Sequence, residues 1–392
     1  MIRRTLAAGA AVAALAVVTA AVPASAGNGT PLNSDSANTL TLAVYGDSPY
    51  GTTPTDTAEF QATPAFIDSI NSDPQVDLVA HVGDIHSGKQ YCTQAYDQSI
   101  FDVWQQYKDP LIYTPGDNEW TDCHKAGEGG NVKDASGNYV DYANGNPIDN
   151  LALIRSIFFA QPGLSLGGRK KQMISQAEAF DPTHPTDANY VENVMWEQSN
   201  TLFFSVNLPG GSNNDADNWW GQPRTQEQAD EIVQRTGADL RWIDAAFAQA
   251  QRDNIASVVI LSQADMWDLD GKPASHIANY APFIQHIADD TTAFANPVLL
   301  FEGDSHHYRS DNPFVQGAPC VTESSATSVP CADDAWQNHA AMNLNVANIH
   351  RVVVHGSTFP LEWLKLTDDP RASNPTTETS FGPFSWARQI QN

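Results

Sequence analysis

Short apolar segments that run into a Gly-Asp dipeptide recur along the chain, and this pattern constrains the fold more than any other feature. The apolar segments are 39–45, 76–82, 111–114 and 297–301, and the dipeptides are Gly46-Asp47, Gly83-Asp84, Gly116-Asp117 and Gly303-Asp304. Residues 57–70 and 96–107, between the first three, have the apolar period of amphipathic helices. Continuous apolar strands that alternate with such helices predict an α/β fold with a mostly parallel sheet covered on both faces.

The rest of the sequence extends this pattern without a boundary between domains. Further predicted elements are helices at 150–159, 225–252 and 280–287, a hairpin at 191–208, and strands at 255–261, 349–354 and 361–366. Residues from about 121 to 185 are rich in Gly, Asn, Asp and Pro, which indicates long surface loops. We therefore expect a single domain over residues 27–392, with long surface loops at about 121–185.

The first 26 residues have the features of a secretory signal peptide. Arg3 and Arg4 precede an apolar run from Leu6 to about Val22, and Ala24-Ser25-Ala26 supplies a small-residue cleavage pattern. A membrane span is the alternative, but no stop-transfer pattern follows the run. We therefore expect residues 1–26 to be removed and the protein to be secreted to an extracellular location.

Four cysteines, Cys92, Cys123, Cys320 and Cys331, take on a specific meaning in an exported protein. An even number of cysteines in an oxidising compartment predicts two disulfides, for which three pairings exist. We favour Cys92–Cys123 and Cys320–Cys331 because each pair is the nearest in sequence. A zinc–thiolate site is the alternative, but the sequence has no C-x-x-C spacing.

The charge of the chain limits its partners. Aspartate and glutamate total 46 against 20 lysines and arginines, which gives a formal net charge of −26. The basic cluster Arg169-Lys170-Lys171 is short, whereas binding to a nucleic acid backbone needs a basic face. An anionic membrane surface is disfavoured for the same electrostatic reason. We expect neither nucleic acid nor a membrane as a partner, and the sequence specifies no oligomeric state.

The four strand ends carry the chemistry that the sequence predicts. In open α/β sheets, ligands bind beyond the carboxyl ends of the strands, so four aspartates at such ends are expected to converge on one crevice. Like charges close together resist joint ionisation, and a bound cation is the simplest compensation. His86, His306 and His307 add nitrogen ligands suited to a transition metal. The alternative is that each Gly-Asp pair only forms a turn.

Five segments, in order, resemble the motifs of calcineurin-like metallophosphoesterases over roughly residues 39 to 366. They are Gly46-Asp47-Ser48, Gly83-Asp84-Ile85-His86, Pro115-Gly116-Asp117-Asn118-Glu119, Ser262-Gln263 and Gly303-Asp304-Ser305-His306. The resemblance implies a four-layer α/β/β/α fold, in which a sandwich of two sheets is flanked by helices. It also implies a metal-dependent phosphoesterase, either a phosphatase or a phosphodiesterase, with a two-metal site.

The metal ligands that the resemblance implies are Asp47, Asp84, Asp117, Gln263, Asp304 and His306. Asp84 stands at the position that bridges the two ions. Asp117 replaces an asparagine of the family motifs, whereas Gln263 and Asp304 each replace a histidine, and all three can bind a metal through oxygen. This shift from nitrogen to oxygen ligands favours the cofactors Mn²⁺, Mg²⁺ or Ca²⁺, with Fe or Zn²⁺ as alternatives.

Asn118 stands where the family places its catalytic histidine. The implied reaction is in-line attack of a metal-activated water on a small phosphorylated substrate, and His86, His124 or His307 could protonate the leaving group. The alternative is a degenerate relative that binds metal or a phosphorylated ligand without turnover. A serine hydrolase is disfavoured because the segment at 303–307 does not fit the G-x-S-x-G pattern.

Overall fold

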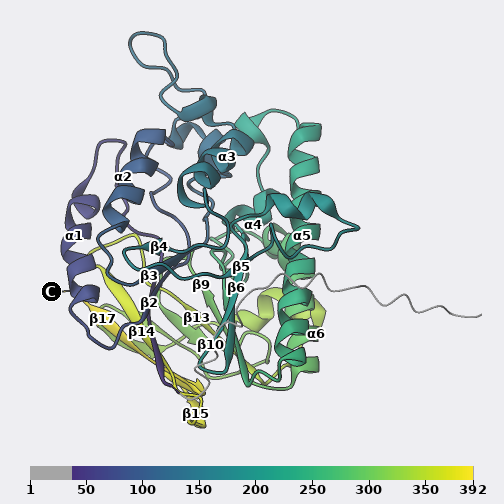
Figure 1. Cartoon of the computed structure of the whole chain (residues 1–392). Helices are drawn as coiled ribbons and strands as arrows, with labels where there is room; N and C mark the ends of the chain where they lie inside the picture. The colour runs from purple at the N-terminus through teal and green to yellow at the C-terminus, as the bar shows by residue number, and fades with distance from the viewer. Residues whose placement is uncertain (1–37, 392) are drawn as a thin grey trace, which may run out of the picture. The chain divides into compact units, whose positions relative to one another are not determined.

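The strands of this protein gather into two mixed β-sheets in a computed structural model that describes residues 38–391 (Figure 1). The strands are β1 (Leu40–Tyr45), β2 (Leu78–His81), β3 (Pro110–Tyr113), β4 (Leu166–Gly167), β5 (Ile174–Ser175), β6 (Val194–Gln198), β7 (Thr201–Ser205), β8 (Ser257–Leu261), β9 (Val298–Glu302), β10 (Arg309–Asp311), β11 (Val321–Ser324), β12 (Thr327–Pro330), β13 (Ile349–Val353), β14 (Glu362–Asp368), β15 (Asn374–Thr377), β16 (Ser380–Gly382) and β17 (Phe384–Ile390). One sheet has the order β15-β16-β17-β14-β1-β2-β3-β4, and the other has the order β12-β11-β10-β13-β9-β8-β7-β6-β5. The predicted signal peptide lies outside the described residues and stays a prediction.

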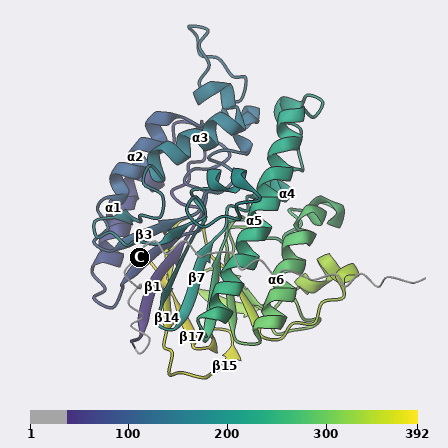
Figure 2. The ribbon, with the colours of Figure 1, turned by 45° about the vertical axis from the view of Figure 1, so that its right-hand side comes forward.

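Helices cover the outer faces of both sheets (Figures 1 and 2). They are α1 (Ala58–Asn71), α2 (Gln94–Trp104), α3 (Pro147–Phe158), the short α4 (Gly210–Asn214), α5 (Gln226–Arg252) and α6 (Ala281–Phe294). The hydroxyls of Thr93 and Thr225 accept hydrogen bonds from backbone N–H groups in the first turns of α2 and α5, which is the usual role of threonine at the start of a helix. Within residues 38–391, none of the helices is both long and apolar enough to cross a membrane.

Three apolar cores separate four layers of structure. Leu42 of β1 and Val259 of β8 belong to the core between the two sheets. Ile67 of α1 belongs to the core on the outer face of the β1 sheet, and Val258 of β8 shares the third core with Ile243 of α5. The neighbours Val258 and Val259 face different cores because side chains alternate along a strand. The prediction of an α/β sandwich of two sheets flanked by helices is confirmed.

The prediction of a mostly parallel sheet is wrong, because both sheets are mixed, whereas the predicted cover on both faces is present. Strands β1, β2 and β3 pair in parallel in one sheet, and β7, β8, β9 and β13 pair in parallel in the other. The first sheet continues with β14 and β17, which run antiparallel to their neighbours. In a sandwich, the second sheet replaces one layer of helices, but the strands are still buried on both faces. Apolar periodicity is the same in both arrangements and cannot separate them.

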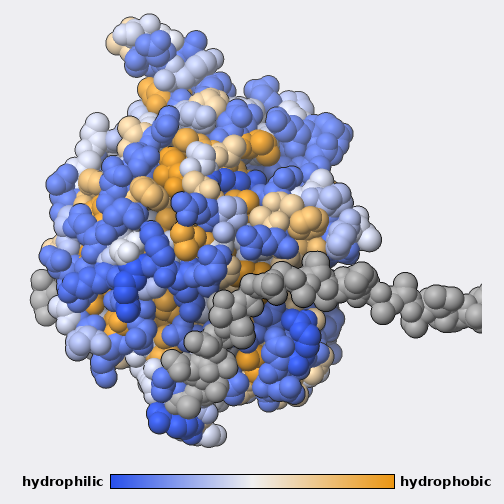
Figure 3. Space-filling view, in the orientation of Figure 1, coloured by the Kyte–Doolittle hydropathy of each residue, from blue (hydrophilic) through white to orange (hydrophobic). Residues whose placement is uncertain are grey.

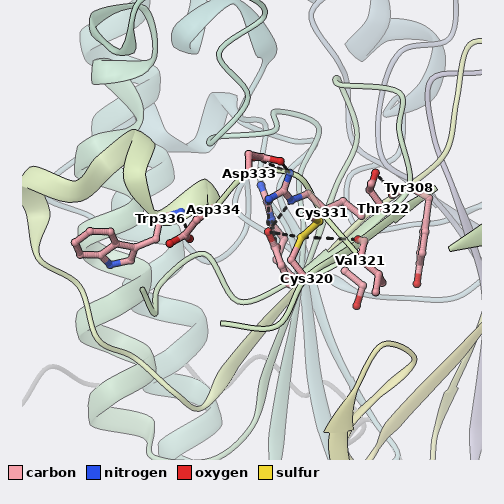
Figure 4. The surroundings of a disulfide bond; sticks show 12 residues. Tyr308, Cys320, Val321, Thr322, Cys331, Asp333, Asp334 and Trp336 are labelled. Atoms are coloured by element: carbon pink, nitrogen blue, oxygen red, sulfur yellow. Dashed lines mark hydrogen bonds and ion pairs between the residues drawn. A yellow bond between two sulfur atoms is a disulfide. The ribbon is translucent and has the colours of Figure 1, made fainter. Parts of the chain in front are cut away.

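Two disulfides have the pairing that the sequence analysis favours. Cys92, before α2, joins Cys123 in the loop that follows Asp117, with the Cα atoms 5.8 Å apart. Cys320 joins Cys331 across the base of the β11–β12 hairpin, where the backbone N–H of Cys331 donates to the carbonyl of Cys320 at 3.1 Å (Figure 4). The first disulfide therefore ties together two of the loops that leave the carboxyl ends of β2 and β3.

Candidate metal centre

The aspartates that follow β1, β2, β3 and β9 come together beyond the ends of these strands. Ligand atoms of Asp47, Asp84 and His306 lie within 4.8 Å of one another, and so do carboxylate oxygens of Asp84, Asp117 and Asp304. We call these groups the first and the second ligand set. Asp84 belongs to both, so the structure places five of the six predicted metal ligands in two adjoining sets that share one carboxylate.

Four residues of these sets hold a backbone conformation that is uncommon for residues other than glycine. The φ angles of Asp47, Asp84, Asp304 and His306 are 49°, 60°, 67° and 66°, all in the left-handed region. Hydrogen bonds between the turns support this conformation. The N–H of Asp47 donates to the carbonyl of Gly83, and the N–H of Asp304 donates to Oδ1 of Asp47, both at 2.9 Å. Strained backbone of this kind clusters at functional sites.

The glycines that precede these aspartates are required mainly for close approach. A Cβ atom at Gly303 would lie 2.6 Å from Oδ2 of Asp47, and one at Gly116 would overlap Oδ1 of Asp84. Gly83 alone among the four also has a positive φ, of 95°. Any larger residue at Gly116 or Gly303 would therefore displace the carboxylate of Asp84 or Asp47.

The carboxylates of the two sets are buried without a basic partner. Asp47, Asp84 and Asp117 are 0%, 1% and 7% exposed. Among the ion pairs of residues 38–391, the only one that involves the four aspartates joins Nε2 of His306 to Oδ1 of Asp47, at 3.7 Å. Burial, with a contribution from neighbouring carboxylates, raises the pKa of Asp47 and Asp84 well above the usual value and that of Asp117 to about 7. The cluster therefore needs a proton or a cation from outside the chain.

The first ligand set fits a divalent cation. Oδ2 of Asp47 is buried and has no hydrogen-bond partner among the described residues, which is costly unless another group binds it. Carboxylate oxygens with one imidazole nitrogen suit a transition metal such as Mn²⁺, Fe or Zn²⁺. The second set offers carboxylate oxygens alone, which are the ligands of harder cations such as Mg²⁺ and Ca²⁺.

Gln263 adjoins the second set, but its orientation differs from the prediction. Its Oε1 accepts a hydrogen bond from the N–H of Gly210 at 2.5 Å, and because this N–H can only donate, it defines the orientation of the amide. Its Nε2 lies 3.3 Å from Oδ2 of Asp84, 3.1 Å from Oδ1 of Asp117 and 3.2 Å from Oδ1 of Asp304. Gln263 therefore presents an N–H donor to the carboxylates, whereas the sequence analysis expected an oxygen ligand.

Asn118 and Tyr50 both bind the carboxylate that the two sets share. Nδ2 of Asn118 donates to Oδ2 of Asp84 at 3.1 Å and to Oη of Tyr50 at 2.8 Å, and Oη of Tyr50 donates to Oδ2 of Asp84 at 2.5 Å. The ring of Tyr50 also meets that of His306 edge-on, with centroids 5.1 Å apart. The sequence analysis missed Tyr50, for which the available signal was its place three residues after Asp47.

His86 and His307, predicted to act in catalysis, belong to neither ligand set. His86 is 0% exposed, and burial lowers its pKa to about 4. Its Nδ1 lies 3.2 Å from the carbonyl of Ser87. His307 is exposed, with Nδ1 3.3 Å from Oε1 of Glu323. The structure therefore does not place either histidine among the ligand atoms around the shared carboxylate.

A G-x-S-x-G segment does occur in the chain, at residues 163–167. Ser165 in this segment is 4% exposed, and its hydroxyl accepts a hydrogen bond from the N–H of Lys171 at 2.8 Å. The segment leads into the short strand β4 and not into a helix. It therefore lacks the strand-to-helix turn that exposes a serine nucleophile.

A cavity of about 230 Å³ opens beside Asp117, Asp304 and His306. Five further acids line it, namely Asp122, Asp217, Asp265, Asp268 and Asp270. Two lysines in the lining are already paired, Lys125 with Asp122 at 2.5 Å and Lys272 with Asp270 at 2.9 Å. We call this the acidic cavity.

A third set of acids and a histidine, away from the strand ends, has its own cation. Glu323, His355 and Glu362 place ligand atoms within 4.8 Å of one another. Arg388 donates to both oxygens of Glu362 at 2.7 Å and to Oε2 of Glu323 at 2.8 Å. Its positive charge occupies the place that a metal would take, so this set is a closed ion-pair network.

The chain was compared with known proteins. A family model for calcineurin-like phosphoesterases matches residues 40–254, which is more than half of the sequence. A search of curated proteins found no significant match. Among solved structures, purple acid phosphatase PPD1 from seeds of yellow lupin (Lupinus luteus) is 12% identical, with a TM-score of 0.40 over 91% of this chain and 53% of that chain. PhoD is 9% identical, with a TM-score of 0.43 over 85% of this chain and 64% of that chain.

This protein belongs to the calcineurin-like phosphoesterase family, as the matched family model shows. The chain spans between half and two thirds of the length of the two solved proteins to which it was compared.

Proposed function

We propose that this protein hydrolyses small phosphorylated substrates with two divalent cations held at the strand ends. The observation that supports this most is the pair of ligand sets that share Asp84 and that have no lysine or arginine partner within residues 38–391. Asp47, Asp84 and His306 would hold one cation, and Asp84, Asp117 and Asp304 would hold the other. Mn²⁺, Mg²⁺ and Ca²⁺ suit these oxygen-rich sets best, and Fe and Zn²⁺ are further candidates.

Bound cations of this kind activate the attacking water, orient the phosphoester and neutralise the charge that develops on the leaving oxygen. The chain's own residues keep the shared carboxylate in place. Asn118 and Tyr50 both donate to Oδ2 of Asp84, so that this side chain cannot rotate without breaking two buried hydrogen bonds. In this proposal Asn118 positions Asp84, and neither His86 nor His307 takes part in the centre.

A second candidate function is the binding of metal or of a phosphorylated ligand without turnover. Two observations favour it. Asn118 provides no titratable group where the family has a catalytic histidine, and Nε2 of Gln263 contacts three carboxylates of the second ligand set. A centre that holds a single cation would still bind phosphate but would stabilise the leaving oxygen less well.

Hydrolysis of nitrophenyl phosphate monoesters and diesters, measured with Mn²⁺, Mg²⁺, Ca²⁺, Fe²⁺ and Zn²⁺ in turn, separates these two functions. The enzyme hypothesis expects metal-dependent release of nitrophenol that EDTA abolishes. Metal content measured on the same samples should then approach two ions per chain. Stoichiometric metal binding without release of nitrophenol from any ester would contradict hydrolysis and support the binding function.

We propose further that the protein acts outside the cytoplasm. This rests on the predicted signal peptide at residues 1–26, and the two disulfides are compatible with an oxidising compartment. Expression of the full chain, followed by N-terminal sequencing of the exported protein, tests it. Cleavage after Ala26 is the expected result, and retention of the protein in the cytoplasm with residues 1–26 intact would contradict it.

A further inference from the structure

A second cavity adjoins the candidate metal centre, and its lining is less acidic than that of the acidic cavity. It has a volume of about 660 Å³ and is lined by Tyr50 and His306 at the centre and by Ala58 and Phe359 farther out. Since His306 lines both cavities, they meet at this residue. A substituent on a phosphorus atom bound at the ligand sets could therefore enter either of them.

Two carboxylates in the wall of the second cavity already accept hydrogen bonds from backbone N–H groups. Glu59 is 4% exposed, and its Oε2 accepts the N–H of Tyr50 at 2.7 Å. Asp56 accepts the N–H groups of Thr52 and Ala58 at 2.9 and 3.0 Å. Because these carboxylates are already bonded to backbone donors, the wall offers mainly carbon to a ligand.

Phe359 divides this cavity from a further apolar one. Phe359 also lines a cavity of about 490 Å³, together with Ala62, Ala65, Phe66 and Leu361. The lining comes from α1 and from the end of the chain at Gln391, and Figure 1 shows the C-terminus beside α1. The two cavities share Phe359 in their linings, and we call them together the apolar groove, with Tyr50 in the lining of one and Leu361 in the lining of the other.

Phe359 is 56% exposed. This degree of exposure is not unusual in itself, but the place of the residue in the molecule is. The face in Figure 3 is mostly hydrophilic with scattered apolar patches, and single exposed apolar residues need no explanation. Four other large apolar side chains are exposed in the described residues, namely Tyr139, Tyr142, Val233 and Val329, but none lines this groove. Phe359 differs in that it lines the same cavity as Tyr50 and His306 of the candidate metal centre.

We propose that the groove binds the hydrocarbon chain of an amphiphilic phosphoester, with its phosphate at the two ligand sets. This inference rests on the proposed function, which supplies the phosphate site. The acidic cavity is unsuited to such a chain, because burying its carboxylates against hydrocarbon would remove their hydration. Lys89 lines the groove beside the centre and forms no ion pair within residues 38–391, so its ammonium can attract the anionic headgroup.

Binding of alkylphosphonates of increasing length tests the proposal without turnover. Methyl-, butyl- and octylphosphonate would be titrated calorimetrically into the full chain, once with Mn²⁺ and once after EDTA. Each methylene that enters the groove should tighten binding by up to about fourfold, so octylphosphonate should bind at least about tenfold more tightly than butylphosphonate. Phe359→Ser and Ala65→Asp, both at exposed positions, should remove most of this gain and leave methylphosphonate unaffected. Val233→Ser, on α5 and outside the groove, is the matched control.

Equal affinity for butyl- and octylphosphonate would overturn the proposal. So would a chain-length gain that survives in both Phe359→Ser and Ala65→Asp. A chain-length gain that both groove variants lose, with no effect of Mn²⁺ at any length, would support the groove and count against the proposed metal centre. The dependence on chain length thus tests the groove, and the dependence on Mn²⁺ tests the phosphate site.

Discussion

Acidic side chains are buried around Arg351 and at the strand ends, but only the first group has arginine partners within the described residues. The guanidinium of Arg351 donates to both oxygens of Asp311 at 2.9 Å, to Oδ1 of Asp265 at 2.6 Å and to Oε2 of Glu302 at 3.2 Å. Arg351 is 1% exposed. Such geometry is the condition under which a buried ion pair persists.

The pKa values show the consequence of this difference. Although burial acts to raise it, the charges of Arg351 and Arg309 hold the pKa of Asp311 below its usual value. Burial and the nearby carboxylates raise the pKa of Asp84 well above that value. Asp311 thus keeps its charge with the help of two arginines, whereas the strand-end acids have no such partners within residues 38–391. Compensation there has to come from solution, as a cation or as protons.

Replacing the shared carboxylate should have the largest effect. Asp84→Asn keeps the size of the side chain but removes the charge common to both ligand sets, so metal content should fall and metal-dependent hydrolysis should drop by about a thousandfold or more. Nitrophenyl ester assays with metal analysis of the same samples measure this. Asp102→Asn, at an exposed position of α2, should change neither. Full metal content in Asp84→Asn would show that metal binding at the strand ends does not require the Asp84 carboxylate.

Removing the internal cation should instead affect folding. Arg351→Met leaves Asp265 and Glu302 without an ionic partner and Asp311 with Arg309 alone, so the free energy of unfolding should fall by about 3–5 kcal/mol. Urea denaturation at pH 7, with and without EDTA, measures it. The loss should be the same in both conditions because no ion is expected at this group. Arg371→Met, at an exposed position, should leave stability unchanged. If added Mn²⁺ restored the stability of Arg351→Met, the acids around Arg351 would also bind a metal ion, and the two groups of buried acids would not differ in this respect.

Asp368 is a buried acid whose charge is expected to be removed by a bound proton and not by a cation. Burial raises the pKa of Asp368 from 3.8 to about 7. Between these values the folded state retains a proton that the unfolded chain has released, so the free energy of unfolding contributed by this group falls as pH rises from about 4 to 7. Asp368→Asn should therefore lessen the loss of stability between pH 5 and pH 8, by about 2 kcal/mol. Denaturation at the two pH values measures it, with Asp102→Asn as the control. An unchanged difference would show that Asp368 is ionised throughout.

Gln263 is expected to weaken the second ligand set, and its replacement gives the smallest effect. Gln263→His removes an N–H donor that faces three carboxylates and supplies a nitrogen ligand, so a second Mn²⁺ should bind about tenfold more tightly. Calorimetric titration of the metal-free protein measures it. Gln222→His, which adds a histidine at an exposed position, serves as the control for surface binding. An unchanged second binding step would mean that the amide does not compete with the cation.

Sequence reasoning found the elements whose signal is local. The strands before the four Gly-Asp pairs and the helices α1, α2 and α5 were predicted because apolar period and length define them within one segment. Strands β11, β12 and β15 were not predicted. Each has four residues and none that is fully buried, so the segments carry no apolar period. The division of the strands into two sheets was implied by the family resemblance and not by periodicity.

The sequence by itself determined which acids stand at strand ends, because a strand and the turn after it are specified by neighbouring residues. Only the tertiary structure decided what meets these acids. Tyr50 reaches Asp84 across 34 positions of the chain, and Gln263 reaches it across 179. The hydrogen bond from Gly210 then sets which atom of Gln263 faces the carboxylates. Contacts of this kind depend on how distant segments pack, and a pattern within one segment carries no information about them.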